Sequence, residues 1–323
     1  MPKISVAMCT YNGARHIHAQ LMSIISQTRQ PDELVIVDDA STDMTLDITE
    51  KTLSNFGGSV IIKRNEKNIG HQKNFQQALS MANGDIIFLS DQDDVWMMSK
   101  IETIMAMFES HESPLLVFHD AELTDAKLNT LYPSFWSTMT PPFIPDEFIR
   151  HDYWHLFHAN VVQGAATAIR RELFDAAQPF PSAAFHDEWL ALVAAAKGRI
   201  LPHDDILIKY RQDTNAVGGL PLTVTGKIKK WLGNTREATA KNIGEISRRA
   251  ELLNEYERRY GDLLDEKNRA TLDNMLRITN ERKESLTQKD KSLLLSASRY
   301  ARAYPFRTAI HEWLKDIITL AAQ

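Results

Sequence analysis

Short apolar runs alternate with amphipathic stretches over the first 120 residues of the chain. The apolar runs contain many β-branched and aromatic residues, which is typical of buried strands. They are Ile4–Cys9, Leu34–Val37, Val60–Ile62, Ile86–Leu89 and Leu115–Phe118. The stretches between them space their apolar residues as helices do, and these are Ala14–Ser26, Thr42–Leu53, Phe75–Ala82 and Trp96–Phe108. Such alternation predicts an α/β fold with a mostly parallel, doubly wound sheet.

The pattern changes after Tyr132. Four prolines mix with aromatic residues over Tyr132–Phe148, which predicts a long loop or lid. Strands are expected again at Val161–Arg170 and Ile206–Arg211, with a helix at His186–Lys197 between them. Beyond Gly219 the periodicity is helical, and the clearest segments are Glu251–Arg259, Leu263–Leu276 and Ile310–Leu320. We place a boundary near Leu220, between an α/β domain of residues 1–220 and a helical region of residues 221–323.

Composition and termini indicate a cytoplasmic protein. The 323 residues include a single cysteine, Cys9, inside the first strand, so no disulfide framework is expected and a reducing compartment is indicated. Met1 lies three residues before that strand, which leaves no room for a signal peptide. No window approaches the roughly 18 consecutive apolar residues of a membrane span.

Charge is divided unevenly along the chain. Residues 221–323 hold 20 Lys and Arg against 14 Asp and Glu, whereas residues 1–220 hold 17 against 28. The acidic front half argues against nucleic acid as the main partner. The basic tail is compatible with a solvated helical face, an acidic-partner surface or a membrane-surface patch. Its stretches 227–232 and 299–307 both combine cations with aromatic rings, as membrane-surface segments do.

Three carboxylates follow the fourth strand within four residues. Asp91, Asp93 and Asp94 stand where that strand emerges, which is where open α/β sheets bind ligands. Like charges this close repel one another unless a cation or hydrogen bonds hold them, and oxygen-only ligands favour Mg²⁺ or Mn²⁺. The alternative is an acidic turn in which Asp94 caps the helix beginning near Trp96, as Ser41 is placed to cap the second helix.

Other polar groups follow the neighbouring strands. They are Thr10-Tyr11-Asn12-Gly13, Asp38-Asp39, Asn65 to Gly70, and His186-Asp187-Glu188 at the start of a later helix. Taken singly, the aspartates are compatible with turns, Asn68 with a turn, and His186-Asp187 with a solvated helix end. The carboxyl ends of adjacent parallel strands converge, so together these groups predict one crevice. Neither phosphate-loop signature, G-x-G-x-x-G or G-x-x-x-x-G-K-[ST], follows any strand, so a diphosphate here would be held through a cation.

These motifs, in this order, resemble the family 2 glycosyltransferases, which have the GT-A nucleotide-diphospho-sugar transferase fold. The matching residues are Ile4–Gly13, Leu34–Asp43 and Asp91-Gln92-Asp93-Asp94. A rhamnosyltransferase-like branch is the most similar, through Asn68-Ile69-Gly70, Asn74-Phe75, Val95-Trp96, His186-Asp187 and Tyr210-Arg211-Gln212. The resemblance covers roughly residues 3–218.

The resemblance implies roles for individual residues. Thr10, Tyr11 and Asp39 would hold the base and ribose of the nucleotide, and Asp91 would lie near the ribose. The motif residues Asn68 and Gln92 would line the same nucleotide-sugar site. Asp93 would ligate Mn²⁺ or Mg²⁺ bridging the diphosphate, and Asp187 would be the general base of an inverting transfer. We expect the helix N-terminus to favour the charged form of Asp187, so that its pKa need not be high.

Two departures from the branch leave alternatives open. Glu188 stands where a second aromatic residue is usual, so it is an alternative base. Asp213 stands where a histidine is usual and is a further candidate metal ligand.

The branch implies transfer from dTDP-L-rhamnose to a glycan or lipid-linked glycan in cell-surface polysaccharide biosynthesis, at the inner face of the cell membrane if the acceptor is lipid-linked. A UDP-hexose is the rival donor. A non-catalytic sugar-nucleotide-binding protein is the rival class. A nucleotidyltransferase fits poorly, because Thr10 to Arg15 is not a glycine- and basic-rich loop. A homo-oligomer is compatible with the helical tail.

Overall fold

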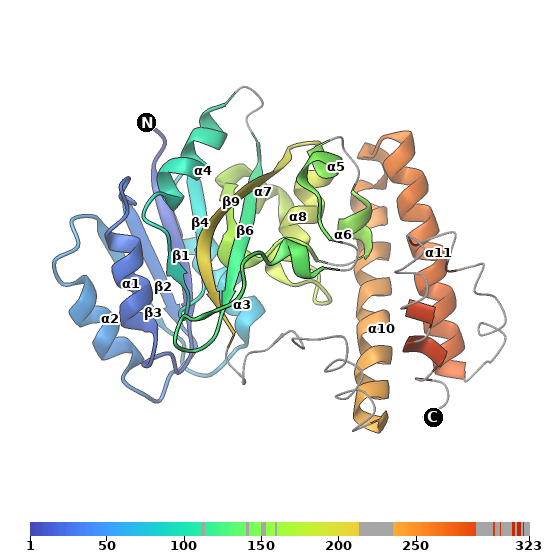
Figure 1. Ribbon diagram of the computed structural model, residues 1–323, viewed down its shortest axis with the longest axis horizontal. Helices are drawn as coiled ribbons and strands as arrows, with labels where there is room; N and C mark the ends of the chain where they lie inside the picture. Colours follow the sequence, from blue (N-terminus) through green and yellow to red (C-terminus); the bar gives the residue numbers. More distant parts are fainter. Residues whose placement is uncertain are drawn as a thin grey trace.

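The computed structural model describes residues 1–110, 114–139, 142–149, 153–158, 160–212 and 235–288, together with residues 300, 304, 312–313, 315–317 and 319. Within these residues, nine strands form one sheet (Figure 1). The strands are β1 Ile4–Thr10, β2 Glu33–Asp38, β3 Ser59–Arg64, β4 Ile86–Ser90, β5 Val95–Trp96, β6 Leu116–Thr124, β7 Thr130–Tyr132, β8 Thr167–Arg170 and β9 Ile200–Arg211.

The sheet joins a parallel half to a mixed half. Its strand order is β3-β2-β1-β4-β8-β6-β9-β5, with β7 paired to β6. The first four strands in this order are parallel, and Met8 of β1 lies between Ile36 of β2 and Ser90 of β4. β8 runs antiparallel to both of its neighbours, whereas β6 and β9 are parallel to each other. The predicted mostly parallel α/β sheet is therefore confirmed, and the parallel half delivers four strand ends to one edge.

Helices pack on the sheet and on one another, and each buries an apolar face in doing so. They are α1 Ile17–Ile25, α2 Thr45–Leu53, α3 His71–Met81, α4 Lys100–Glu109, α5 Pro145–Ile149, α6 Trp154–His158, α7 Arg171–Ala177, α8 His186–Ala196, α10 Thr235–Tyr260 and α11 Glu266–Gln288. α8 is the most enclosed of these helices, since every one of its residues except Asp187 is buried.

Several predicted boundaries were wrong. The helix expected at Trp96–Phe108 begins at Lys100, because Val95 and Trp96 pair with Lys209 and Ile208 of β9 as a strand. Asp94 therefore caps no helix. Ser41 does not cap α2 either, because the helix begins at Thr45.

Other elements differ in extent from those predicted. β6 and β9 are longer than expected, and α3 begins at His71 rather than Phe75. The strand expected at Val161–Arg170 is confined to Thr167–Arg170, and it follows a 3-10 turn, η2, at Gly164–Ala166.

The proline-rich segment packs on the sheet rather than standing off as an open loop. The rings of Trp136, Phe143 and Phe148 surround Phe118 of β6 at centroid distances of 5.6, 5.6 and 5.5 Å. Trp136 belongs to a 3-10 turn, η1, at Trp136–Thr138, and Phe148 belongs to α5. Aromatic burial of this kind offsets the backbone entropy of an irregular segment.

The C-terminal helices share the core of the α/β part. α10 and α11 lie side by side (Figure 1). Tyr256 of α10 is fully buried, and its ring centroid lies 5.8 Å from that of Phe157 and 6.4 Å from that of Trp189 in α8. The boundary predicted near Leu220 lies outside the described residues. Across the described helices, none combines the length and hydropathy needed to cross a membrane.

Candidate active site

Hydrogen bonds join the loops that follow β1 and β4. The Tyr11 N–H donates to the side-chain oxygen of Gln92 at 2.8 Å, and the Gln92 amide donates back to the Tyr11 carbonyl at 3.0 Å. Tyr11 itself is 47% exposed. Thr10, in contrast, is buried, and its hydroxyl donates to Asp38 at 2.8 Å. The two loops are therefore joined, with Tyr11 exposed and Thr10 buried as an internal support.

Asp39 organises the loop after β3. Its buried carboxylate accepts hydrogen bonds from the Asn65 side chain at 2.9 Å, the Ile69 N–H at 2.8 Å and the Gly70 N–H at 2.9 Å. Gly70 has a φ of 87°, which a side chain would disfavour. Asn68 closes the same turn by accepting from the Gly70 N–H at 3.1 Å. One oxygen of Asp39 accepts a single bond, so the carboxylate has capacity for one further donor.

Two neighbours hold the acid loop after β4. The Asp91 carboxylate lies 3.3 Å from Nε2 of His71, the first residue of α3. Burial alone would raise the pKa of Asp91, but the hydrogen bond with His71 lowers it. Arg211 donates through Nε to the Asp93 carbonyl at 2.6 Å and through its backbone N–H to Asp94 Oδ1 at 3.0 Å. Arg211 thus fixes the loop that carries all three acids.

Asp94 is the most constrained of these acids. It is fully buried, and among the described residues its Oδ2 has no hydrogen-bond partner. Burial, with the nearby charges of Asp93 and Asp91, holds the pKa of Asp94 well above its usual range.

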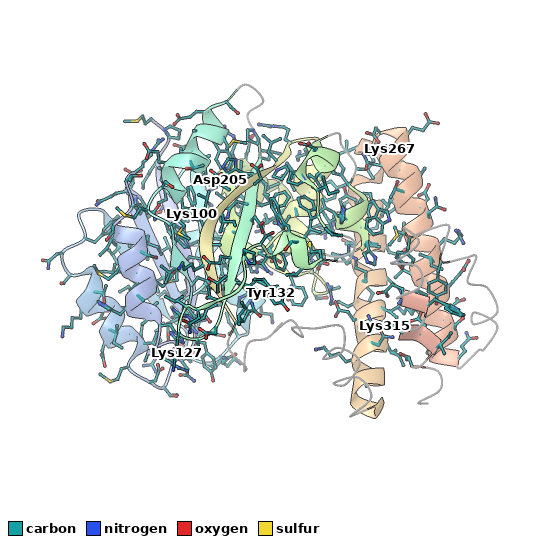
Figure 2. All side chains as sticks on the ribbon, viewed as in Figure 1. Lys100, Lys127, Tyr132, Asp205, Lys267 and Lys315 are labelled. Atoms are coloured by element: carbon teal, nitrogen blue, oxygen red, sulfur yellow. The ribbon has the colours of Figure 1, made fainter. Side chains whose placement is uncertain are left out.

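A buried lysine lies behind the acid loop. Lys100 of α4 is fully buried, donates through Nζ to the Ala165 carbonyl at 2.6 Å, and lies 3.9 Å from the centroid of the Trp96 ring. Burial lowers its pKa to about 7, against the opposing effect of Asp94 and Asp91. Figure 2 shows Lys100 inside the α/β part, whereas Lys127 and Lys267 lie at the periphery. Sequence reasoning missed Lys100, because a lysine on an amphipathic helix is ordinarily solvated.

The acid loop fits a divalent cation that is held jointly by the protein and the substrate phosphates, rather than by protein side chains alone. Within the described ranges, no group of three or more His, Cys, Asp or Glu side chains is gathered to hold a metal. Mg²⁺ is commonly held by one or two carboxylates together with substrate phosphates, so such a group is not required. The donors here are all oxygens, and the Oδ2 of Asp94 is a buried polar atom without a hydrogen-bond partner among the described residues. Asp213, the second predicted ligand, lies outside the described residues.

Asp187 lies in the first turn of α8, where it interacts electrostatically with His71 and Tyr210. Its Oδ2 accepts from the Gly164 N–H at 3.1 Å, and its Oδ1 accepts from the Glu188 N–H at 2.7 Å. Burial raises the pKa of Asp187 to about 6, and the neighbouring charge of Glu188 adds to the effect. The expectation that the helix N-terminus would keep this pKa low was therefore wrong, since desolvation outweighs the helix end. A carboxylate with a pKa near 6 is suited to general base catalysis at neutral pH.

Glu188 is occupied elsewhere. It is 2% exposed and ion-paired to Arg248 at 2.7 Å and to Arg249, both from α10. A buried carboxylate held by two guanidinium groups is not placed to accept a proton from a substrate. Of the two predicted bases, the geometry favours Asp187.

His186 and Tyr210 complete the surroundings of Asp187. The His186 ring stacks on Phe75 at a centroid distance of 3.9 Å, and neither of its nitrogens has a hydrogen-bond partner in the described part of the chain. Burial lowers its pKa to about 3, so it is a neutral packing group and not half of a solvated pair. Burial and the charges of Asp91, Asp94, Asp93 and Asp187 raise the pKa of Tyr210 well above its usual range, so its phenol is a neutral donor among the site acids.

The sheet, with an acid loop after β4, has the GT-A fold of glycosyltransferases. Among solved structures, the mannosyltransferase PcManGT from Pyrobaculum calidifontis, in complex with GDP-Man and Mn²⁺, superposes with a TM-score of 0.57 at 17% identity, covering 99% of this chain and 86% of that one. Residues 5–176 match the model of Glycosyl transferase family 2, and the chain belongs to this family.

Two sequence relatives support the same assignment. The chain is 32% identical over 133 residues to the putative glycosyltransferase EpsE of Bacillus subtilis, a match covering 39% of this chain and 48% of that protein. It is 35% identical over 131 residues to the dTDP-rhamnosyl transferase RfbG of Shigella flexneri, covering 39% of this chain and 43% of that protein. Each match thus spans less than half of the relative's length.

Proposed function

We propose that this family 2 glycosyltransferase moves a sugar from a nucleoside-diphosphate sugar to a saccharide acceptor with inversion at the anomeric carbon, in a metal-dependent reaction. The observation that carries the proposal is Asp187. It is the one residue of α8 that is only partly buried, it is fixed by two backbone N–H groups, and desolvation raises its pKa to about 6. The acids of the donor side, Asp91 to Asp94, follow β4 in the same sheet.

The chemistry follows from one base and one displacement. Asp187 accepts the proton of the acceptor hydroxyl, the acceptor oxygen forms a bond to the anomeric carbon, and the bond from that carbon to the diphosphate breaks. A single displacement inverts the configuration. A bound Mn²⁺ or Mg²⁺, held by Asp93, would neutralise the departing nucleoside diphosphate. Tyr210 remains protonated beside these groups and can donate a hydrogen bond to the sugar or the diphosphate.

The nucleotide is assigned to the loops after β1, β2 and β3. The exposed ring of Tyr11 is available to the base, and the spare acceptor position on Asp39 suits a pyrimidine N–H. Asn68 and Gln92 shape these loops through the turn at Gly70 and the pairing with Tyr11. We assign Asp91 to the ribose.

For the donor we propose dTDP-L-rhamnose. The support is the similarity to the dTDP-rhamnosyl transferase RfbG and the fit of Asp39 to a pyrimidine. A UDP-hexose satisfies the same contact and is the second candidate. A non-catalytic sugar-nucleotide-binding protein is disfavoured, because a chain without catalysis has no need of a base held with two hydrogen bonds and a raised pKa.

A donor panel tests the proposal. Purified full-length protein with Mn²⁺ should be thermally stabilised by dTDP-L-rhamnose, more than by UDP-glucose or GDP-mannose, because ligand binding raises apparent stability by mass action. Slow metal-dependent hydrolysis of the same donor, releasing a sugar of inverted configuration, should follow. Stabilisation by uridine nucleotides alone would replace the donor. No stabilisation and no hydrolysis with any nucleotide sugar would overturn the function.

For the acceptor we propose a growing cell-surface glycan, and a lipid-linked one would place the reaction at the inner face of the cell membrane. The tail stretch 227–232 lies outside the described residues. In the other stretch, Tyr300 and Tyr304 are buried and hydrogen-bonded to Asp316 and Arg282, so these rings are not available to a lipid surface. Sedimentation with anionic vesicles, comparing the full chain with its Lys227, Lys229 and Lys230→Ser variant, tests the remaining stretch.

A further inference from the structure

Two arginines of α10 converge on the residue that follows the proposed base. Arg248 Nη1 lies 2.7 Å from Oε2 of Glu188, and Arg249 Nη1 donates to Oε1 of the same carboxylate. Glu188 and Arg249 are both buried. Two guanidinium groups compensate the charge of this buried carboxylate. A carboxylate at the surface would be solvated by water and would not need two such partners.

Each arginine also holds a segment near the start of α8. Arg248 donates to the Ala183 carbonyl at 2.8 Å, and its guanidinium lies 4.7 Å from the centroid of the Phe185 ring. Arg249 donates to the Phe157 carbonyl at 3.3 Å at the end of α6. α10 therefore fixes the residues immediately before α8 as well as its first turn.

The link to Asp187 runs through the backbone of Glu188. The N–H of Glu188 donates to Oδ1 of Asp187 at 2.7 Å, so the residue whose side chain α10 holds is also the residue whose backbone orients the base. Any movement of Glu188 toward solvent would carry this N–H away from Asp187.

The charge of Glu188 is a second link to Asp187. The groups that face Asp187 are Glu188 beside it, the Gly164 N–H from η2, His71 from α3 and Tyr210 from β9. Among these, the charge of Glu188 disfavours ionisation of Asp187, while His71 favours it. The two arginines neutralise Glu188 and so limit its effect on the base.

We propose that α10 is part of the catalytic apparatus, with Arg248 and Arg249 as positioning residues that set the geometry and ionisation of Asp187 through Glu188. The proposal rests on the proposed function, since it takes Asp187 as the base. It gives the C-terminal helical region a role in turnover that does not require contact with the substrate.

The test is a double-mutant cycle on the full chain, using Arg249→Met, Glu188→Gln and the double variant. Arg249→Met should lower kcat about tenfold or more, since small displacements of a catalytic group have effects of this size. The donor KM should stay within about twofold, and the acid limb of the kcat–pH profile should move to higher pH, because a Glu188 anion compensated by Arg248 alone opposes ionisation of Asp187 more strongly. The double variant, which removes both charges, should recover much of kcat and return the limb toward the wild-type position.

Matched variants keep the result interpretable. Arg258→Met changes an exposed arginine of the same helix, which pairs with Glu255, and it should behave as the wild type. Should Arg249→Met fold poorly, Arg249→Lys, which keeps the charge with fewer donors, should give a smaller loss of kcat with the limb unmoved.

Two outcomes would count against the inference. An unmoved acid limb in Arg249→Met, with a kcat loss that matches only its loss of folded protein, would reduce the arginines to structural anchors. Asp187→Asn separates the two proposals: if Asp187→Asn is inactive while Arg249→Met is unaffected, only the inference fails. If Asp187→Asn is fully active, the assignment of the base fails, and the inference fails with it.

Discussion

Gly164 donates its backbone N–H to Oδ2 of Asp187 at 3.1 Å. The same glycine lies against the ring of His186, whose Nε2 would be 2.7 Å from a Cβ added at residue 164. The close approach brings turn η2 and the first turn of α8 together, so a glycine is required where the base receives one of its two hydrogen bonds.

Gly164→Ala should therefore impair catalysis. The added methyl group cannot be accommodated while His186 remains stacked on Phe75, so α8 and η2 must separate and the bond from the residue 164 N–H to Asp187 must lengthen. We expect kcat to fall about tenfold or more with donor KM little changed. Gly244→Ala is the matched control. A Cβ at this helical position meets nothing within 4 Å, and the change should leave kcat intact. Wild-type kcat in Gly164→Ala would show that the close contact does not hold the base.

Asp187→Asn should lower turnover about a hundredfold or more, the usual scale for loss of a general base, with donor affinity little changed. In the wild type, the base must be ionised, so kcat should rise with pH through the pKa of Asp187 at about 6. This acid limb should be absent from any residual activity of Asp187→Asn.

Glu188→Gln should affect stability more than turnover, the opposite of Asp187→Asn. It leaves two arginines without their buried partner, so the free energy of unfolding should fall by about 3 kcal/mol while measurable turnover remains. Urea unfolding and kcat on the two variants separate these roles. An inactive but stable Glu188→Gln, beside an active Asp187→Asn, would move the base by one residue.

Asp93→Asn should abolish metal-dependent turnover and leave the fold intact. An amide is a weaker ligand than a carboxylate for a hard cation, so the departing diphosphate would lose its counter-charge. The wild type should lose activity in chelator and regain it with Mn²⁺ or Mg²⁺. Asp205→Asn, an exposed carboxylate of β9, serves as the control. Chelator-resistant activity in the wild type would remove the metal from the mechanism.

The sequence predicts the parts of this site whose signal is local. Asp39 and Asp91 each stand two residues after an apolar run, and the convergence of parallel strand ends predicts that they lie in one crevice. The β5 pairing was not predicted, because Val95 and Trp96 acquire strand geometry only from β9, more than 100 residues further along the chain.

The partners of the catalytic groups could not be predicted from nearby residues for the same reason. No sequence signal near Glu188 indicates Arg248 and Arg249, which lie 60 and 61 residues away. Yet these arginines decide that Glu188, and not Asp187, is held in ion pairs. The pKa of Asp187 also depends on burial by the assembled fold, which its position at a helix start does not reveal.

Lys100 gives a prediction for stability rather than turnover. Its pKa falls from an ordinary 10.5 to about 7 on folding because the ammonium is buried. Between these values the unfolded chain binds a proton that the folded protein has released, so raising the pH favours the folded state. From pH 7 to pH 9 this linkage should add about 2 kcal/mol to the free energy of unfolding.

Urea unfolding of wild type, Lys100→Met and Lys267→Met at both pH values measures this linkage. Methionine preserves much of the volume and removes the titrating group, so Lys100→Met should lack the gain that the wild type shows. Lys267→Met changes an exposed lysine at the periphery and should keep the gain (Figure 2). An equal pH response in wild type and Lys100→Met would mean that Lys100 stays protonated in the folded protein. The buried cation would then be a fixed counter-charge behind Asp94, not a group that folding has neutralised.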